Sequence, residues 1–269
     1  MTNSIGEVNL SAARAAAQQI ARCWRDGSKL DALPDDIRPH DLASAYAAQA
    51  ALVDVMDDAV LGWKIAATSA NGQQHIGVDA PIAGRLFASR VLAHADKVSM
   101  RGNSMAAAEC EFVFRFAKPL PARTTGYTCA EVMAAVGSLH PGLELPDSRL
   151  RDFATAGAGQ LIADNACTHW MAVGAATQAN WRDVDLRSHA TALYVDEHCV
   201  THGSGADVLG DPRDALTWLV NTLCAQNIDI SVGQLVTTGV TGQPSPVHAG
   251  HKVCADLGAF GQVEVELVD

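Results

Sequence analysis

The sequence predicts an α+β protein with an antiparallel or mixed sheet. Two segments with helical periodicity come first, whereas most segments with the alternation of strands come later in the chain. Many connections between those later segments have the length of hairpins, which join antiparallel neighbours. Neither a G-x-G-x-x-G motif nor a P-loop occurs, so nucleotide binding is not indicated.

The composition is that of a globular protein. The 269 residues are 48% hydrophobic and 18% charged, and the formal net charge is −11. This acidic balance argues against nucleic acid and anionic membranes as partners. The seven cysteines are scattered without a C-x-x-C pair, as is typical of reduced thiols. Because there is no membrane-length apolar run and no signal-peptide pattern, we expect a cytoplasmic protein.

Two helices are expected in an N-terminal unit that spans residues 1–59. Ser11 can cap the first helix, which would end near Asp26, and the second would begin near Asp41. Both segments carry apolar stripes at helical spacing. We expect this unit to pack against a larger domain over residues 60–269.

The pattern changes to strand alternation over residues 60–67. Trp63 and Ile65 share one face, and Lys64 lies on the other among small residues. A lysine with small neighbours leaves room for a ligand, although a surface lysine shows the same pattern. The segment 71–87 contains glycines and a proline, and we expect a loop with one short helical turn.

Residues 108–116 carry an informative strand pattern. Glu109 and Glu111 lie on one face, and the other face is apolar, with Cys110, Phe112, Phe114 and Phe116. Because the apolar face must be buried, the two carboxylates stand together on the opposite face and repel each other. A solvated strand face and a metal site both fit this pattern.

The rest of the chain alternates between helix and strand patterns. Thr128 and Glu131 form a capping-box pair for a helix through Leu139. In the extended segment 141–146, Glu144 lies between two leucines and points away from the face that they bury. Later segments predict a strand near 170–173, a hairpin over 191–200, a helix over 212–223, and strands over 235–240, 252–256 and 262–267.

Together, Glu109, Glu111 and Glu144 would form a site of three carboxylates. Such oxygen ligands suit hard divalent cations such as Mg²⁺ or Mn²⁺ rather than zinc or copper. An octahedral ion held by three single oxygen atoms keeps three open positions, and a 2-oxo acid would fill two of them. The histidines compete weakly, because His248 and His251 lie in a loop without a nearby cysteine or carboxylate.

Six segments resemble, in order, the motifs of a known family. They are residues 62–65 with Thr68 and Ser69, residues 77–81, the Glu109-x-Glu111 pair, residues 143–149, residues 163–166, and residues 238–239. This ordered set covers nearly the whole chain. It resembles the 2-keto-4-pentenoate hydratases and their sister group, the 4-oxalocrotonate decarboxylases, which belong to the fumarylacetoacetate hydrolase superfamily.

The resemblance implies a fold, a site and a reaction. The fold is a short N-terminal helical unit plus a catalytic mixed β-sandwich roll, assembled into a homo-oligomer. The implied ligands of Mg²⁺ or Mn²⁺ are Glu109, Glu111 and Glu144, while Lys64 and Asp79 line the substrate site as the catalytic pair. The reaction is hydration of 2-hydroxypenta-2,4-dienoate to 4-hydroxy-2-oxopentanoate in aromatic meta-cleavage catabolism.

Two departures from the family pattern concern substrate contacts. Where the hydratases carry serine after Asp-Asn-Ala, this chain has Cys167 followed by Thr168, which are the substrate-binding residues that the resemblance implies. A thiol is a weaker hydrogen-bond donor than a hydroxyl. The late loop has His251 and Lys252 after Gly250, where Gly-Asp is usual.

Alternative activities use the same site. Decarboxylation of a 4-oxalocrotonate-type 2-oxo diacid needs the same metal and the same chelating group, and the sequence does not separate it from hydration. Hydrolysis of an acylpyruvate needs an activated water, for which we identify no His/Glu pair. A catalytically silent homologue that associates with a pathway enzyme is the remaining possibility.

Overall fold

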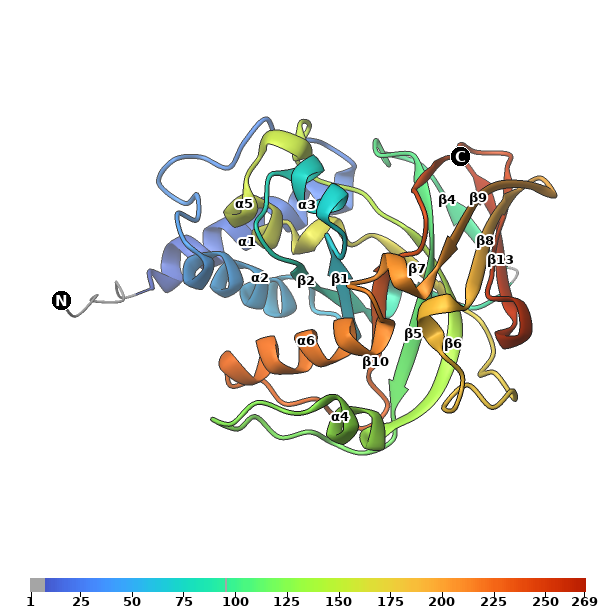
Figure 1. The fold of residues 1–269 in the computed structure, drawn as a ribbon. Helices are drawn as coiled ribbons and strands as arrows, with labels where there is room; N and C mark the ends of the chain where they lie inside the picture. The colour runs from blue at the N-terminus through green and yellow to red at the C-terminus, as the bar shows by residue number, and fades with distance from the viewer. Residues whose placement is uncertain (1–7, 95) are drawn as a thin grey trace.

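The computed structural model describes residues 8–94 and 96–269 of the chain. An N-terminal helical unit lies beside two curled β-sheets (Figure 1). Each sheet contains both parallel and antiparallel strand pairs. The predicted α+β class with mixed sheets is therefore confirmed.

The N-terminal unit is built from helices α1 (Leu10–Asp26) and α2 (Leu42–Met56), which pack against each other. The side chain of Asn9, rather than the expected Ser11, caps α1 by accepting hydrogen bonds from two amides of its first turn. The expected cap was wrong by two positions, because Ser11 already lies inside the helix. Asp41 caps α2 as expected.

The larger sheet has the strand order β2-β1-β10-β5-β6-β7-β3, with β11 beside β5. Within it, β1 runs parallel to β10 and β3 parallel to β7, whereas β5 is antiparallel to both β10 and β6. Its strands are β1 (Val60–Ala66), β2 (Ile82–Phe87), β3 (Val91–Leu92), β5 (Ala107–Phe116), β6 (Val136–Leu145), β7 (Trp170–Val173), β10 (Leu235–Val240) and β11 (Ser245–Pro246).

The second sheet has the order β4-β13-β12-β8-β9. The expected hairpin is formed by β8 and β9, and the last two expected strands of the chain are β12 and β13. The five strands are β4 (Lys97–Ser99), β8 (Ala190–Val195), β9 (His198–Ser204), β12 (Lys252–Asp256) and β13 (Gln262–Val268).

Four further helices connect the strands: α3 (Ala70–Ile76), α4 (Cys129–Ala135), α5 (Ala158–Ala163) and α6 (Pro212–Ala225). The capping box of α4 is formed as expected, but the helix ends at Ala135 instead of reaching Leu139. Its apparent last turn belongs to β6, because residues from Val136 onward pair with β5. None of the helices in the described part of the chain is long and apolar enough to cross a membrane.

The main core lies between the two sheets. Phe112 and Phe114 on β5 are fully buried and cluster with Leu193 and Val253 of the second sheet. This confirms the expected apolar face of the strand. Because side chains alternate along a strand, the other face of β5 is left for the polar groups described below.

Buried charged side chains attach the helical unit to the rest of the chain. The guanidinium of Arg149 lies 4.2 Å from the centre of the Trp24 ring and pairs with Asp164. Lys29 pairs with Asp147, and α2 packs against α5. These contacts cross the predicted domain boundary, which itself stays a prediction.

His169 lies within this cationic junction, and both of its ring nitrogens face N–H donors. Nε2 lies 3.3 Å from a guanidinium nitrogen of Arg90, and Nδ1 lies 3.4 Å from the side-chain nitrogen Nδ2 of Asn103. Burial, together with the charges of Arg149, Arg90 and Lys29, lowers the pKa of His169 to about 2. The ring therefore stays neutral in the folded protein. In the unfolded chain the same histidine takes up a proton once the pH falls below its ordinary pKa of about 6.5.

We expect His169 to make folding stability fall as the pH drops below about 6.5. The stability that the neutral His169 contributes is fully present above about pH 6.5. As the pH falls from there toward about 2, the free energy of unfolding drops by up to about 1.4 kcal/mol per pH unit. Urea unfolding of the wild type and of His169→Gln at pH 7.5 and 5.5 measures this, and the variant should lose less stability on acidification. His198→Gln, at an exposed histidine, is the control and should behave like the wild type. Equal acid sensitivity of His169→Gln and wild type would contradict the assignment.

Candidate active site

Three glutamates gather where β5 and β6 run side by side. Glu109 lies directly opposite Glu144 in the antiparallel register, and Glu111 follows two residues later on the same face. One oxygen from each carboxylate lies within 4.8 Å of the other two. Glu111 and Glu144 are 0% and 1% exposed, so water cannot compensate their charges.

The carboxylates of this cluster repel one another. Burial and the charge of Glu144 raise the pKa of Glu109 to about 7, and burial with both neighbouring charges raises the pKa of Glu111 well above its ordinary value. Among the described residues, no group donates a hydrogen bond to either oxygen of Glu144 or to Oε1 of Glu111. Buried oxygens without donors fit a hard divalent cation, and these three side chains would hold it.

A glycine in β10 supports the cluster from the neighbouring strand. The amide of Gly239 donates a hydrogen bond of 2.8 Å to Oε2 of Glu111. Gly239 has a φ of +102°, and a Cβ at this position would lie 2.1 Å from the hydroxyl oxygen of Thr68. Only glycine fits here, which explains the Thr-Gly motif at residues 238–239.

Lys64 reaches the cluster from β1, on the other side of β10. Its Nζ lies 3.2 Å from Oε1 of Glu144, at an angle outside the range of a hydrogen bond, and the side chain is 4% exposed. Burial disfavours the charge of Lys64, but the negative charges of Glu144, Glu109 and Glu111 outweigh it and raise its pKa above the ordinary value. Lys64 is therefore an ammonium group that partly compensates the cluster.

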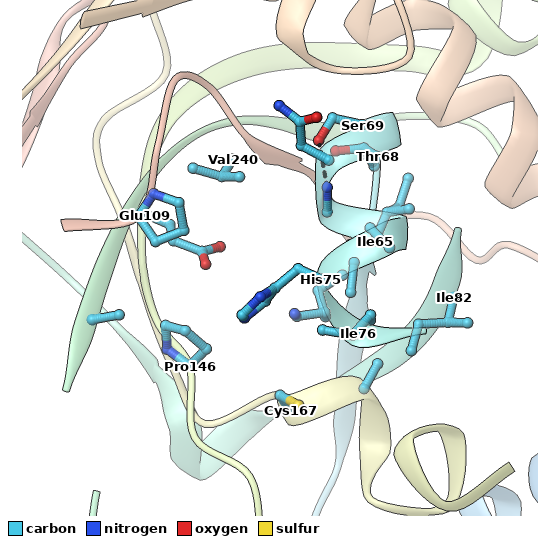
Figure 2. A pocket seen from close by; sticks show the side chains of 18 of the residues that line it. Ile65, Thr68, Ser69, His75, Ile76, Ile82, Glu109, Pro146, Cys167 and Val240 are labelled. Atoms are coloured by element: carbon cyan, nitrogen blue, oxygen red, sulfur yellow. Dashed lines mark hydrogen bonds between the residues drawn. The ribbon is translucent and has the colours of Figure 1, made fainter. Parts of the chain in front are cut away.

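A cavity of about 510 Å³ opens beside Lys64 and Glu109 (Figure 2). Much of its wall is apolar, and the side chains of Ile65, Ile76, Ile82, Phe153 and Val240 contribute to it. Such a cavity is large enough for a small organic molecule, and it is polar at the end where Lys64 and Glu109 lie.

Cys167 lines the cavity from a strained turn. Three successive residues, Asn165, Ala166 and Cys167, have left-handed φ values of 56°, 52° and 59°. Residues without the freedom of glycine adopt this conformation at a cost of roughly 1 kcal/mol or more each, and such strain is concentrated at functional sites. Cys167 points toward the cavity in Figure 2, and burial raises the pKa of its thiol to about 12. The thiol is thus a neutral group at the cavity wall.

The family assignment follows from comparison with known proteins. Residues 64–268 match the family model described as fumarylacetoacetate (FAA) hydrolase C-terminal. The chain belongs to the fumarylacetoacetate hydrolase family. The match begins at Lys64 and includes all three glutamates, so the candidate site lies within it.

The chain is similar to curated hydratases of this family over nearly its whole length. It is 27% identical to the 2-keto-4-pentenoate hydratase of Burkholderia vietnamiensis, over 94% of this chain and 96% of the relative. It is 26% identical to the 2-hydroxyhexa-2,4-dienoate hydratase of Comamonas testosteroni, over 94% and 96% of the two chains.

Solved structures of the family share the fold. The 4-oxalocrotonate decarboxylase from Pseudomonas putida G7, complexed with magnesium and adipate, superimposes with a TM-score of 0.88 at 23% identity, over 97% of this chain and 99% of that one. The fumarylpyruvate hydrolase from Pseudomonas aeruginosa, in complex with Mn²⁺ and pyruvate, gives a TM-score of 0.55 at 15% identity, over 77% and 88%. The fold expected from the family resemblance is thereby confirmed.

In this fumarylacetoacetate hydrolase family member, the seven residues expected at the site lie at different places. The fold brings together the three glutamates, Lys64 and Cys167. Thr168 is buried behind the cavity wall, where its hydroxyl donates a hydrogen bond of 2.6 Å to the carbonyl of Asn165. Asp79 is exposed in the loop between α3 and β2 and is not among the residues that line the cavity.

His75 is a cavity residue that the sequence did not indicate. It lies on α3 and points into the cavity, as Figure 2 shows, with its ring 5.8 Å from that of Phe153. A single exposed histidine on a short helix has no sequence pattern that distinguishes it from a surface residue. The short helical turn expected between residues 71 and 87 was the nearest signal.

Proposed function

We propose that this protein is a divalent-metal-dependent hydratase. It adds water to a 2-hydroxy-2,4-dienoate of the 2-hydroxypenta-2,4-dienoate type and yields a 4-hydroxy-2-oxo acid. The observation that carries the proposal is the buried cluster of three glutamates beside Lys64, at the polar end of a largely apolar cavity. The curated relatives named as hydratases support the choice of reaction.

The proposed cofactor is Mg²⁺ or Mn²⁺, held by Glu109, Glu111 and Glu144. When bound, such an ion supplies Lewis-acid stabilisation of negative charge on the carboxylate and 2-oxygen of the substrate. The choice of a hard cation is supported by the all-carboxylate donor set and by related structures solved with magnesium, calcium and Mn²⁺.

We assign to Lys64 the proton that moves to the terminal carbon during ketonisation. Its ammonium group lies at the cavity end beside the three glutamates, within reach of a substrate held there. As the terminal carbon gains this proton the 2-hydroxyl loses one, which gives an α,β-unsaturated ketone. Water then adds with its hydroxyl at C4 and its remaining proton at C3. Cys167 is proposed to contact the substrate, and Thr168 to position the Asn165–Cys167 turn behind it. We assign no proton transfer to the exposed Asp79.

The chemistry of the cavity wall favours a monocarboxylate over a diacid. Apart from Lys64, Glu109 and Cys167, the titratable side chain among the described lining residues is His75. A diacid of the 4-oxalocrotonate type would require compensation of a second carboxylate, and among the described lining residues Lys64 is the sole lysine or arginine. Decarboxylation therefore stays the second candidate, with His75 as its distal partner.

An assay of the purified full chain separates these activities. It is incubated with 2-hydroxypenta-2,4-dienoate or with 2-oxohex-3-enedioate, with Mg²⁺, Mn²⁺ or a chelator, and absorbance loss and CO₂ release are followed. Metal-dependent absorbance loss with the monoacid and no CO₂ is the expected result. CO₂ release from the diacid would assign a decarboxylase instead, and no reaction with either would favour a silent scaffold. Light scattering of the same samples measures the expected homo-oligomer, alone and with a pathway enzyme.

A further inference from the structure

A second cavity, of about 680 Å³, is lined by residues of α2, β2 and α6. Figure 1 shows α2 and α6 on the same side of β1 and β2. The floor of the cavity is formed by Arg85 of β2, which pairs directly with Trp63 of β1. Because side chains alternate along a strand, Trp63 and Arg85 share the face of the sheet opposite to Lys64. The second cavity is therefore separated from the candidate active site by the sheet itself.

Arg85 differs from the other buried cations of the described chain. Lys64, Arg85 and Arg149 are the lysine and arginine residues that are buried there, at 3%, 7% and 1% exposure. Lys64 pairs with Glu144 and Arg149 with Asp164, whereas no described carboxylate pairs with Arg85. A largely buried charge without a counter-charge is costly, so an anion in the cavity would stabilise this arginine.

The surroundings of Arg85 fix its position without neutralising it. Gln49 is fully buried, and its Nε2 donates hydrogen bonds to the carbonyls of Ala83 and Ile162, at 2.6 and 3.0 Å. Its oxygen is thereby turned toward Arg85 and accepts a hydrogen bond from Nη1. The Trp63 ring centre lies 4.6 Å from the guanidinium carbon. Within residues 8–94 and 96–269, the remaining side-chain N–H groups of Arg85 have no acceptor.

Tyr46 supplies a second donor to the same cavity. Its hydroxyl oxygen accepts a hydrogen bond of 3.3 Å from the amide of Ala83, which leaves its own proton for another acceptor. The rest of the lining is mostly apolar, with Ala43, Ala47, Ala50, Ala225 and Ile228 among it, and Thr222 and Gln226 are its polar members. A guanidinium group, a hydroxyl donor and a mostly apolar lining together suit a ligand that joins a carboxylate to a hydrocarbon chain.

We propose that this cavity binds a small carboxylate with an apolar body. The guanidinium of Arg85 and the hydroxyl of Tyr46 hold the carboxylate, while the alanines of α2 and α6 contact the body. One planar guanidinium pairs with a carboxylate through two parallel hydrogen bonds, which is the geometry that a single arginine offers. This site does not depend on the reaction at the glutamate cluster.

Hexanoate and its uncharged analogue hexanamide test the site on the full chain. Titration calorimetry in a chelator, which keeps divalent ions from the glutamate cluster, should detect hexanoate but not hexanamide. Arg85→Met removes the charge while keeping an apolar side chain, and it should weaken hexanoate binding about tenfold or more. Ala47→Leu narrows the cavity while keeping Arg85 and should also weaken binding. Lys64→Met is the matched control for binding at the other cavity and should bind hexanoate as the wild type does.

Several results would overturn the proposal. They are an absence of hexanoate binding to the wild type, equal binding to Arg85→Met, and equal binding of hexanamide. Circular dichroism and the melting temperature of Arg85→Met establish that the variant is folded. Light scattering of the wild type and of Arg85→Met tests whether the carboxylate comes instead from a second copy of the chain. Suppose that the wild type is an oligomer that does not bind hexanoate and that Arg85→Met dissociates it. A side chain of a second copy then fills the site, and the small-molecule assignment is wrong.

Discussion

Lys64→Met is expected to lower turnover by about 10²–10⁴-fold, the usual contribution of a general acid or base. The methionine keeps most of the volume of the lysine side chain but has no proton to transfer. Mg²⁺ or Mn²⁺ should still bind, because the substitution leaves the three glutamates in place and removes a competing positive charge 3.2 Å from Glu144. Turnover with 2-hydroxypenta-2,4-dienoate and calorimetric titration of the metal measure the two effects separately.

Lys97→Met is the matched control for this prediction. Lys97 is also a strand lysine paired with a glutamate, Glu266 at 3.2 Å, but its side chain is 68% exposed on the second sheet. We expect its turnover to equal that of the wild type. If Lys64→Met kept near-wild-type turnover, Lys64 would not be the proton-transferring group. If the variant lost its metal instead, Lys64 would have a structural role in the cluster.

The sequence was most informative where local alternation decides which way a side chain points. Glu109 and Glu111 could be placed on one face of a strand because Phe112 and Phe114 require the other face to be buried. The third ligand needed more than alternation. Glu144 joins the cluster because the β5–β6 register sets it opposite Glu109. A register that pairs residues 35 positions apart has no local signature in the sequence. The family resemblance supplied that link.

Tertiary contacts override local preference where the predicted helix end was wrong, and they also place residues that no local pattern marks. The helix expected to reach Leu139 ends at Ala135 because the following residues gain strand pairing with β5. The exposed position of Asp79 is set by the loop between α3 and β2, whose course has no local signature in the sequence. The Arg85–Gln49 pair joins residues 36 positions apart, and neither carries a pattern that predicts burial.

Glu111→Gln is expected to weaken Mg²⁺ or Mn²⁺ binding at least about 100-fold, since changes to groups that only hydrogen-bond to a metal ligand already cost about 10–100-fold. Turnover should fall with it at any metal concentration that does not saturate the variant. The same substitution should have the opposite effect on the metal-free protein. Burial and the neighbouring charges raise the pKa of Glu111, which means that its ionised form is destabilising there, and a neutral amide avoids that cost.

These opposed effects make the prediction specific to a metal ligand. In a chelator, Glu111→Gln should melt at or above the temperature of the wild type, whereas added Mn²⁺ should raise the melting temperature of the wild type alone. Glu266→Gln, at a half-exposed carboxylate of the second sheet, should respond to Mn²⁺ as the wild type does. An equal Mn²⁺-induced shift in Glu111→Gln and wild type would show that the ion binds elsewhere. A fall in melting temperature without metal would instead assign Glu111 a structural role through its hydrogen bond from Gly239, because a glutamine retains the acceptor but not the charge.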